Sequence, residues 1–181
     1  MPALADALST LDRDRATFLA AYDALAPAQR TFRPAPAAWS ADDVAEHLAR
    51  VDAGMLAILR RQVDAGDARR DLGRPSRVKQ ALVTRFMRSD ARTRMPPAVA
   101  PRVAPVGADP VESRATLAAS AGAWATLVAS VPPDLEPTPL WSHPVGGAYT
   151  AAQAVSFHAA HFDHHVRQLA RIRSAVGFPA A

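Results

Sequence analysis

A chain of 181 residues with 49% hydrophobic content is long enough to form one domain with a full core. It contains no cysteine, which excludes disulfides and thiolate metal sites and leaves nitrogen and oxygen atoms as the ligands of any metal. The net charge of +4 is unevenly distributed: residues 60–102 hold 12 basic residues against 4 acidic ones, and the rest of the chain has a net charge of −4.

The N-terminal residues and the apolar stretches of the sequence were compared with targeting and membrane signals. The first residues lack a basic region followed by an apolar run, and no apolar stretch reaches the length that spans a membrane. We therefore expect a cytoplasmic protein that makes no membrane contact.

Apolar residues recur at helical spacing over residues 3–26, which predicts a first amphipathic helix that Pro27 ends. Arg15 falls within this apolar stripe, where it either lines a polar pocket or extends its charged end to solvent. Residues 27–39 contain three prolines and predict an extended connection. Ser40, followed three residues later by Asp43, then predicts a capped second helix.

The segment 66–108 predicts a long, basic, proline-rich crossover with a possible extra helix over residues 76–93. The apolar stripe of that helix would consist of Val78, Leu82 and Phe86. The positive charge fits a solvated arginine-rich face, and it also fits contact with nucleic acid. Because aromatic platforms and DNA-recognition motifs are lacking, we expect no specific nucleic-acid partner.

Two further helices are expected after the crossover. Asp109 before Pro110 predicts the start of the third long helix, and the prolines at 132 and 133 end it. Residues 134–149 predict a turn-rich loop, in which His143 packs against Trp141 rather than binding a metal.

Thr150 predicts the cap of the last helix, over residues 151–175. No segment alternates apolar and polar residues as a half-buried strand does. We therefore predict the all-α class and one four-helix bundle over residues 1–181.

A stretch of eight residues in the last helix, residues 158–165, contains four of the six histidines. His161 and His165 are one turn apart on its apolar stripe, and two inward imidazoles at this spacing can chelate a metal. Buried imidazoles need either a metal or hydrogen-bond partners, and the two residues alone leave both interpretations open. We expect His158 at the boundary of the buried face and His164 in solvent. His47 lies on the apolar face of the second helix.

Several short patterns together resemble the DinB/YfiT-like superfamily of metal-dependent enzymes. They are Phe32-Arg33-Pro34 before Trp39-Ser40, Val44-Ala45-Glu46-His47-Leu48, His143-Pro144 with Gly146 or Gly147, and His161 to His165 with Gln168-Leu169. The resemblance implies a four-helix bundle with two crossover connections, and often a homodimer. It also implies a divalent metal held by three histidines, which correspond by position to His47, His161 and His165.

Three imidazoles would leave open positions on nickel, zinc, iron or manganese, as in catalytic sites. A zinc-peptidase motif is not expected, because Phe162 follows the first histidine of the pair where such enzymes have glutamate. Gln168 lies one turn beyond His165 and either orients a ligand or makes a hydrogen bond between helices. Glu46 points about 100° away from His47, so we expect it at the surface or in the second shell.

Some members of the superfamily resemble transferases that use the thiols bacillithiol or mycothiol. A metal with an open position suits this chemistry, because it binds a thiol as the nucleophilic thiolate. We therefore expect a thiol S-transferase or related detoxification enzyme; the alternatives are a metal-assisted hydrolase and a non-catalytic stress-response protein that binds metal. Arg85 and Arg88 could overhang the metal and bind the carboxylates of an anionic thiol cofactor.

Overall fold

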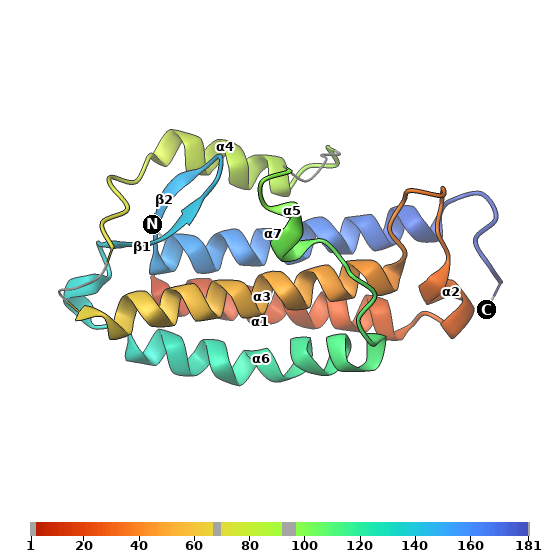
Figure 1. The fold of residues 1–181 in the computed structure, drawn as a ribbon, viewed down its shortest axis with the longest axis horizontal. Coiled ribbons are helices and arrows are strands. Elements are labelled where there is room, and N and C mark those ends of the chain that lie inside the picture. The colour runs from red at the N-terminus through yellow and green to blue at the C-terminus, as the bar shows by residue number, and fades with distance from the viewer. Residues whose placement is uncertain (1–2, 67–69, 92–96, 181) are drawn as a thin grey trace.

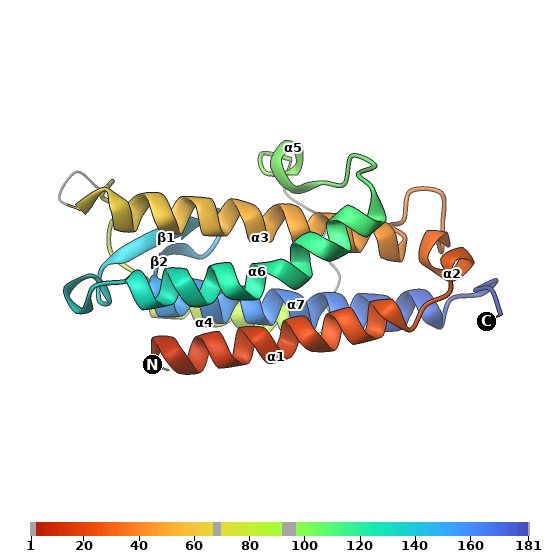
Figure 2. The ribbon, with the colours of Figure 1, turned by 90° about the horizontal axis from the view of Figure 1, so that it is seen from below.

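The computed structural model describes residues 3–66, 70–91 and 97–180, and its centre is a bundle of four long helices. They are α1 (Leu4–Asp23), α3 (Ala41–Asp64), α6 (Pro110–Ser130) and α7 (Ala151–Arg173). Helices α1 and α7 pack along each other, as do α3 and α6, and the members of each pair run in the same direction (Figure 1). Figure 2 shows the same bundle from below. The predicted all-α four-helix bundle is confirmed.

Side-chain caps explain where the long helices begin. Ser40 and Asp43 form the expected capping box: each backbone N–H is bonded by the other residue's side chain. Thr150 and Gln153 repeat this arrangement at the start of α7. Asp109 accepts hydrogen bonds from two N–H groups in the first turn of α6. The local sequence therefore determines these three boundaries.

Two connections contain regular structure that we did not predict. Residues 27–31 form a short helix, α2 (Pro27–Thr31), because proline suits the first helical position and the Gln29 side chain accepts from the Ala26 N–H. The loop after α6 holds a short 3₁₀ turn (Pro133–Leu135) and a hairpin of β1 (Pro139–His143) and β2 (Gly147–Thr150). Gly147 supplies the positive φ of 76° that the hairpin turn requires. These strands are too short to show a period in the sequence.

The crossover from α3 to α6 runs back along the bundle and contains α4 (Arg77–Met87) and α5 (Ala100–Val103). Helix α4 confirms the possible extra helix, but its expected apolar stripe is wrong: Val78 and Leu82 are 71% and 62% exposed. The buried residues are Gln80 and Val83. Gln80 donates to the Ala148 carbonyl of β2, so a polar contact helps hold α4 on the hairpin. Residues 67–69 and 92–96 of the predicted crossover lie outside the described residues.

Within the described ranges, no helix combines the length and apolar character needed to cross a membrane.

Candidate metal centre

Helices α3 and α7 bring three imidazoles together inside the bundle. The Nε2 atom of His161 lies 3.3 Å from Nε2 of His47 and 2.9 Å from Nε2 of His165. Nitrogen ligands about 2.05 Å from a tetrahedral zinc ion are about 3.3 Å apart, so this spacing suits one ion at the centre. These residues form a group that could hold a metal ion, with one ligand atom from each within 4.8 Å of the others.

The three rings are buried, and burial favours the form that binds metal. His47, His161 and His165 are between 4% and 8% exposed. Burial lowers the pKa of His47 to about 4, although the nearby Val103 carbonyl acts in the opposite direction. Burial and the neighbouring rings also hold the pKa values of the other two histidines well below the ordinary range. All three rings are therefore neutral near pH 7, and each has one nitrogen lone pair to offer.

Hydrogen bonds on the far side of two rings decide which nitrogen carries that lone pair. Nδ1 of His47 lies 2.8 Å from the Val103 carbonyl, which can only accept, so Nδ1 carries the proton. Nδ1 of His165 donates in the same way to the Gln168 amide oxygen, at 2.7 Å. The Nε2 atoms of both rings are then unprotonated and face His161. An oxygen that accepts from the other ring nitrogen is typical of histidines that bind metal.

The His161 ring differs from the other two in the surroundings of its second nitrogen. Its Nδ1 atom is buried and has no hydrogen-bond partner among the described residues. Its Nε2 atom faces the Nε2 lone pairs of His47 and His165. Without a metal, a single proton on His161 Nε2 would have to form hydrogen bonds to both of these atoms. A cation at the centre would use all three Nε2 lone pairs at once, so these residues fit a metal ion.

The crossover contributes to this site through a contact that the sequence did not reveal. The Glu46 carboxylate accepts from the backbone N–H groups of Val106, Gly107 and Ala108 at 2.6, 2.9 and 3.0 Å. Glu46 is only 3% exposed, so the surface position that we considered for it is wrong. It fixes the chain just after α5, and therefore close to the Val103 carbonyl that orients His47.

His158 is not a boundary residue but a fully buried member of a separate polar cluster. Its Nε2 atom donates to Asp52 at 2.8 Å, and the Trp124 indole donates to the same oxygen at 2.9 Å. Arg15, 2% exposed, lies 3.8 Å from Asp52 and 2.6 Å from Asp12, so buried ion pairing replaces the solvent-directed position considered for it. Helix α7 is surrounded on this side by α1 and α3.

His164 is buried as well, which makes its expected place in solvent wrong. It is 7% exposed, and its ring centroid lies 5.2 Å from that of His165. Burial lowers its pKa, and the charge of Arg171 lowers it further. His143 behaves as expected: its Nδ1 atom accepts from the backbone of the hairpin turn, and its ring contacts Trp141.

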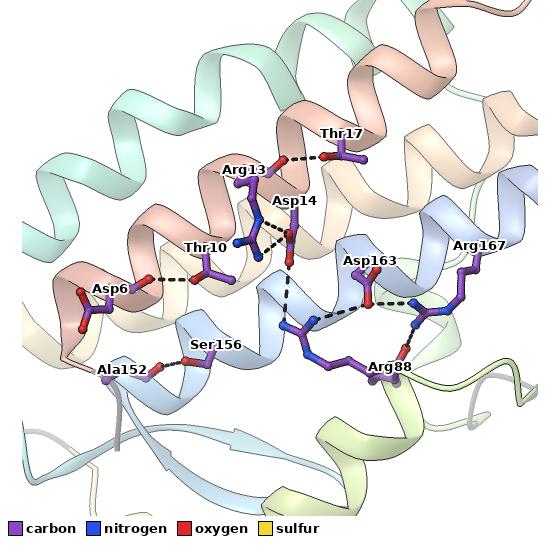
Figure 3. Close-up of polar contacts among 11 residues, drawn as sticks. Asp6, Thr10, Arg13, Asp14, Thr17, Arg88, Ala152, Ser156, Asp163 and Arg167 are labelled. Atoms are coloured by element: carbon purple, nitrogen blue, oxygen red, sulfur yellow. Dashed lines mark hydrogen bonds and ion pairs between the residues drawn. The ribbon is translucent and has the colours of Figure 1, made fainter.

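Arg85 and Arg88 have surroundings that differ from each other. Arg85 is exposed on α4. Arg88 extends between α1 and α7, where its guanidinium lies 3.9 Å from Asp14 and 3.5 Å from Asp163 (Figure 3). Asp163 also binds Arg167 at 2.8 Å. Arg88 therefore links the end of α4 to the bundle, and cofactor binding by these two arginines stays a prediction.

A hollow of about 570 Å³ lies beside the three histidines, between the loop before α3 and the last turns of α7. Its lining includes Trp39, His164, Gln168 and Arg171. The sequence analysis named Trp39 only as part of a pattern shared with the superfamily, and it gave no sign of a pocket there. The volume is within the range of small-molecule sites.

Comparison with known proteins gave one family and one solved structure of similar fold. The structure is that of YfiT from Bacillus subtilis, described as having an unusual four-helix bundle topology. It is 16% identical in sequence, has a TM-score of 0.65, and covers 97% of this chain and 89% of its own. No curated protein matches this chain. The family model of the DinB superfamily matches residues 10–169, which include the three central histidines, and the chain therefore belongs to the DinB superfamily.

Proposed function

We propose that this protein is a divalent-metal-dependent enzyme whose metal ligands are His47, His161 and His165. The observation that carries the proposal is the convergence of their Nε2 atoms, with the opposite nitrogens of two rings held by Val103 and Gln168. Nickel, zinc, iron and manganese all accept imidazole, and the ligand set does not favour one over the others.

The reaction that these residues support best is transfer of a low-molecular-weight thiol of the bacillithiol or mycothiol type. A divalent ion in the site would supply Lewis acidity, which lowers the pKa of a thiol and makes the thiolate available near pH 7. The chain has no cysteine, so the sulfur comes from a cosubstrate. Its sulfur forms a bond to an electrophilic carbon, the leaving group departs with the bonding electrons, and the thiol proton passes to the buffer.

The surroundings of the histidines favour thiol transfer because that reaction needs no general base. The group that could hold a metal contains no carboxylate among the described residues. Glu46, next to His47, already accepts three backbone hydrogen bonds, and Asp52 belongs to the separate cluster in which His158 and Trp124 bond one of its oxygens. The chain's own contribution is to keep three imidazoles neutral, to exclude water by burial and to hold the cosubstrate in the adjoining hollow.

Metal-assisted hydrolysis is the second candidate, because YfiT is described as "a probable metal-dependent hydrolase". The same Lewis acidity would lower the pKa of water rather than of a thiol. The two reactions are distinguished by the nucleophile that appears in the product.

Metal content tests the proposed ligands. Untagged protein should contain about one divalent transition-metal ion per chain by elemental analysis. His47→Ala and His161→Ala should lose it, and His143→Ala should retain it because that ring serves the hairpin. Equal metal content in all four proteins would refute the ligand assignment.

Product analysis tests the reaction. Protein reloaded with each candidate metal is incubated with monobromobimane and either thiol, and in parallel with a panel of nitrophenyl esters. We expect faster thiol conjugation than with His165→Ala. Faster ester cleavage alone would support the hydrolase, and rates equal to those of the variant in both assays would indicate a non-catalytic protein.

We also propose a homodimer, as the resemblance to the superfamily implies. The chain mass is 19.2 kDa, so light scattering should give twice this value. A mass of one chain across the working concentration range would refute it.

A further inference from the structure

A single buried carboxylate joins all four long helices of the bundle. Asp52 of α3 accepts, through its Oδ1 atom, from the His158 ring of α7 at 2.8 Å and from the Trp124 indole of α6 at 2.9 Å. The Arg15 guanidinium of α1 lies 3.8 Å from the same oxygen. None of these four residues is more than 2% exposed, so solvent does not compete for their contacts.

The Asp52 carboxylate is charged although it is buried. Burial raises its pKa, but the hydrogen bonds from His158 and Trp124 and the charge of Arg15 outweigh this effect and hold the pKa below its ordinary value. A buried charge is costly unless its partners stay in place. Sliding one helix past another would therefore leave a charge or a donor without its partner, and the cluster favours one arrangement of the four helices.

This cluster lies next to the proposed metal centre on both helices that supply the ligands. Asp52 follows His47 by five residues on α3, and His158 precedes His161 by three residues on α7. These offsets correspond to about 7.5 and 4.5 Å along the helix axes. Because α3 and α7 run in opposite directions, both offsets lead the same way along the bundle (Figure 1). The Asp52–His158 hydrogen bond therefore lies beside the His47–His161 pair.

The relative position of α3 and α7 determines whether three ligand atoms can converge. His161 and His165 belong to one helix, so their spacing depends on α7 alone, whereas His47 comes from α3. Metal–ligand distances tolerate deviations of about 0.2 Å, which is much less than a helix can slide when nothing fixes it. The Asp52–His158 bond is a contact between these two helices that uses no ligand atom.

We propose that Asp52 and His158 are positioning residues of the metal centre, and that their hydrogen bond holds α3 in register with α7 so that His47 meets the two histidines of α7. Trp124 and Arg15 fix the carboxylate from the other two helices. This inference rests on the ligands in the proposed function. It predicts that metal affinity follows the hydrogen bonds of Asp52 and not the overall stability of the protein.

Two substitutions of Asp52 separate these effects. Asp52→Asn can keep an oxygen at the place of Oδ1, because Oδ2, where the NH₂ group would lie, is buried without a hydrogen-bond partner among the described residues. This variant loses the charge beside Arg15, so it should be less stable but bind zinc about as tightly as the natural protein. Asp52→Leu accepts no hydrogen bond, and its zinc affinity should fall about tenfold.

A second pair of variants checks the same point from other positions. His158→Phe keeps a ring against Trp124 but removes the donor, so its zinc affinity should also fall about tenfold. Leu59→Ala is the matched control, because Leu59 is 1% exposed among apolar residues and lies about 18 Å beyond His47 along α3. It should lose stability and keep its zinc affinity.

Two measurements report on the centre itself. Competition with a chromophoric chelator gives zinc affinity, and the absorption spectrum of cobalt-loaded protein reports the geometry of the ligands. The spectrum should be the same in the natural protein, Asp52→Asn and Leu59→Ala, and it should change in Asp52→Leu and His158→Phe. Affinities that fall in step with stability across all four variants would overturn the proposal.

The natural protein provides a test that needs no variant at Asp52. The Trp124 indole proton, assigned by comparison with Trp124→Phe, should exchange slowly with solvent in the metal-free protein, because its bond to Asp52 is buried. An indole proton that becomes protected only after zinc is added would show that the metal builds the cluster, which overturns the proposal. This result is decisive even if Asp52→Leu fails to fold.

Failure of the proposed function and failure of this inference give different results. If His47→Ala retains the metal, the ligand assignment is wrong and the positioning role falls with it. If His47→Ala loses the metal while Asp52→Leu and His158→Phe bind zinc as tightly as the natural protein, the ligands are correct and the positioning role alone is overturned.

Discussion

Replacing Glu46 with glutamine tests whether the crossover positions a metal ligand. The carboxylate uses one oxygen for the Val106 N–H and the other for Gly107 and Ala108. Glutamine keeps one oxygen, which can serve the latter two groups, but its NH₂ then faces the Val106 N–H. The variant therefore loses a hydrogen bond and the charge while keeping the shape of the side chain.

The contacts of Glu46 indicate how much the variant should lose in stability and in metal affinity. A hydrogen bond to a charged group contributes about 1.5–3 kcal/mol, so the free energy of unfolding should fall by about 2–3 kcal/mol. Loss of the group that hydrogen-bonds a metal ligand lowers metal affinity by about 10–100-fold. Glu46 acts on His47 only through the chain that carries the Val103 carbonyl, so we expect about tenfold, at the lower end of that range.

Zinc affinity is measured by competition with a chromophoric chelator, and stability by urea unfolding of the metal-free protein. Glu112→Gln is the matched control, because Glu112 is exposed in the first turn of α6. Lower stability with unchanged zinc affinity would show that Glu46 holds the crossover without positioning His47. Unchanged stability would refute the role of the buried carboxylate itself.

Changes at four other places test further parts of the structure. Gln168→Leu removes the acceptor of the His165 ring, so zinc affinity should fall about tenfold with the helical signal retained, and an unchanged affinity would make that bond incidental. Burial lowers the pKa of His143 to about 4, below its ordinary 6.5, so the unfolded state binds more protons between these values. Stability of the metal-free protein should therefore fall as the pH is lowered through this window, by at most about 1.4 kcal/mol per pH unit from this group, and His143→Asn should reduce the slope seen in urea titrations. Asp52→Asn should cost about 3 kcal/mol because the residue is 1% exposed and paired, whereas exposed Asp134→Asn should cost less than about 0.5 kcal/mol; equal urea midpoints would contradict this. The basic crossover should bind labelled DNA duplexes weakly, without sequence preference, and lose them near about 0.15 M salt, whereas tight selective binding would point to a regulator instead of an enzyme.

The sequence was sufficient for the features that depend on local periodicity. Apolar spacing placed the four long helices, and short capping patterns such as Ser40 with Asp43 placed their first residues. The same spacing put His47, His161 and His165 on inward faces, where the structure brings their Nε2 atoms together. Resemblance to a family supplied the step that periodicity cannot make, which is that these faces meet across two helices.

Features that depend on what covers a helix were not predictable in this way. A helical projection gives the direction in which Glu46 and His164 point. It does not show that the crossover packs over Glu46, or that other parts of the chain bury His164. Val103 acts through its backbone carbonyl, which has no signature in the sequence. The hollow next to Trp39 likewise exists only because a loop and the end of α7 meet there.

The charge of the proposed centre bears on which nucleophile it would select. Three neutral imidazoles leave the full double positive charge on a bound divalent ion, whereas sites with carboxylate ligands cancel part of it. The Glu46 carboxylate, next to His47 in sequence, is neutralised in part by the three backbone N–H groups that it accepts from. A thiolate bound at the centre would therefore meet a net positive charge. This arrangement favours an anionic thiol over water as the nucleophile, and it predicts that raising the salt concentration increases KM for such a thiol more than it changes kcat.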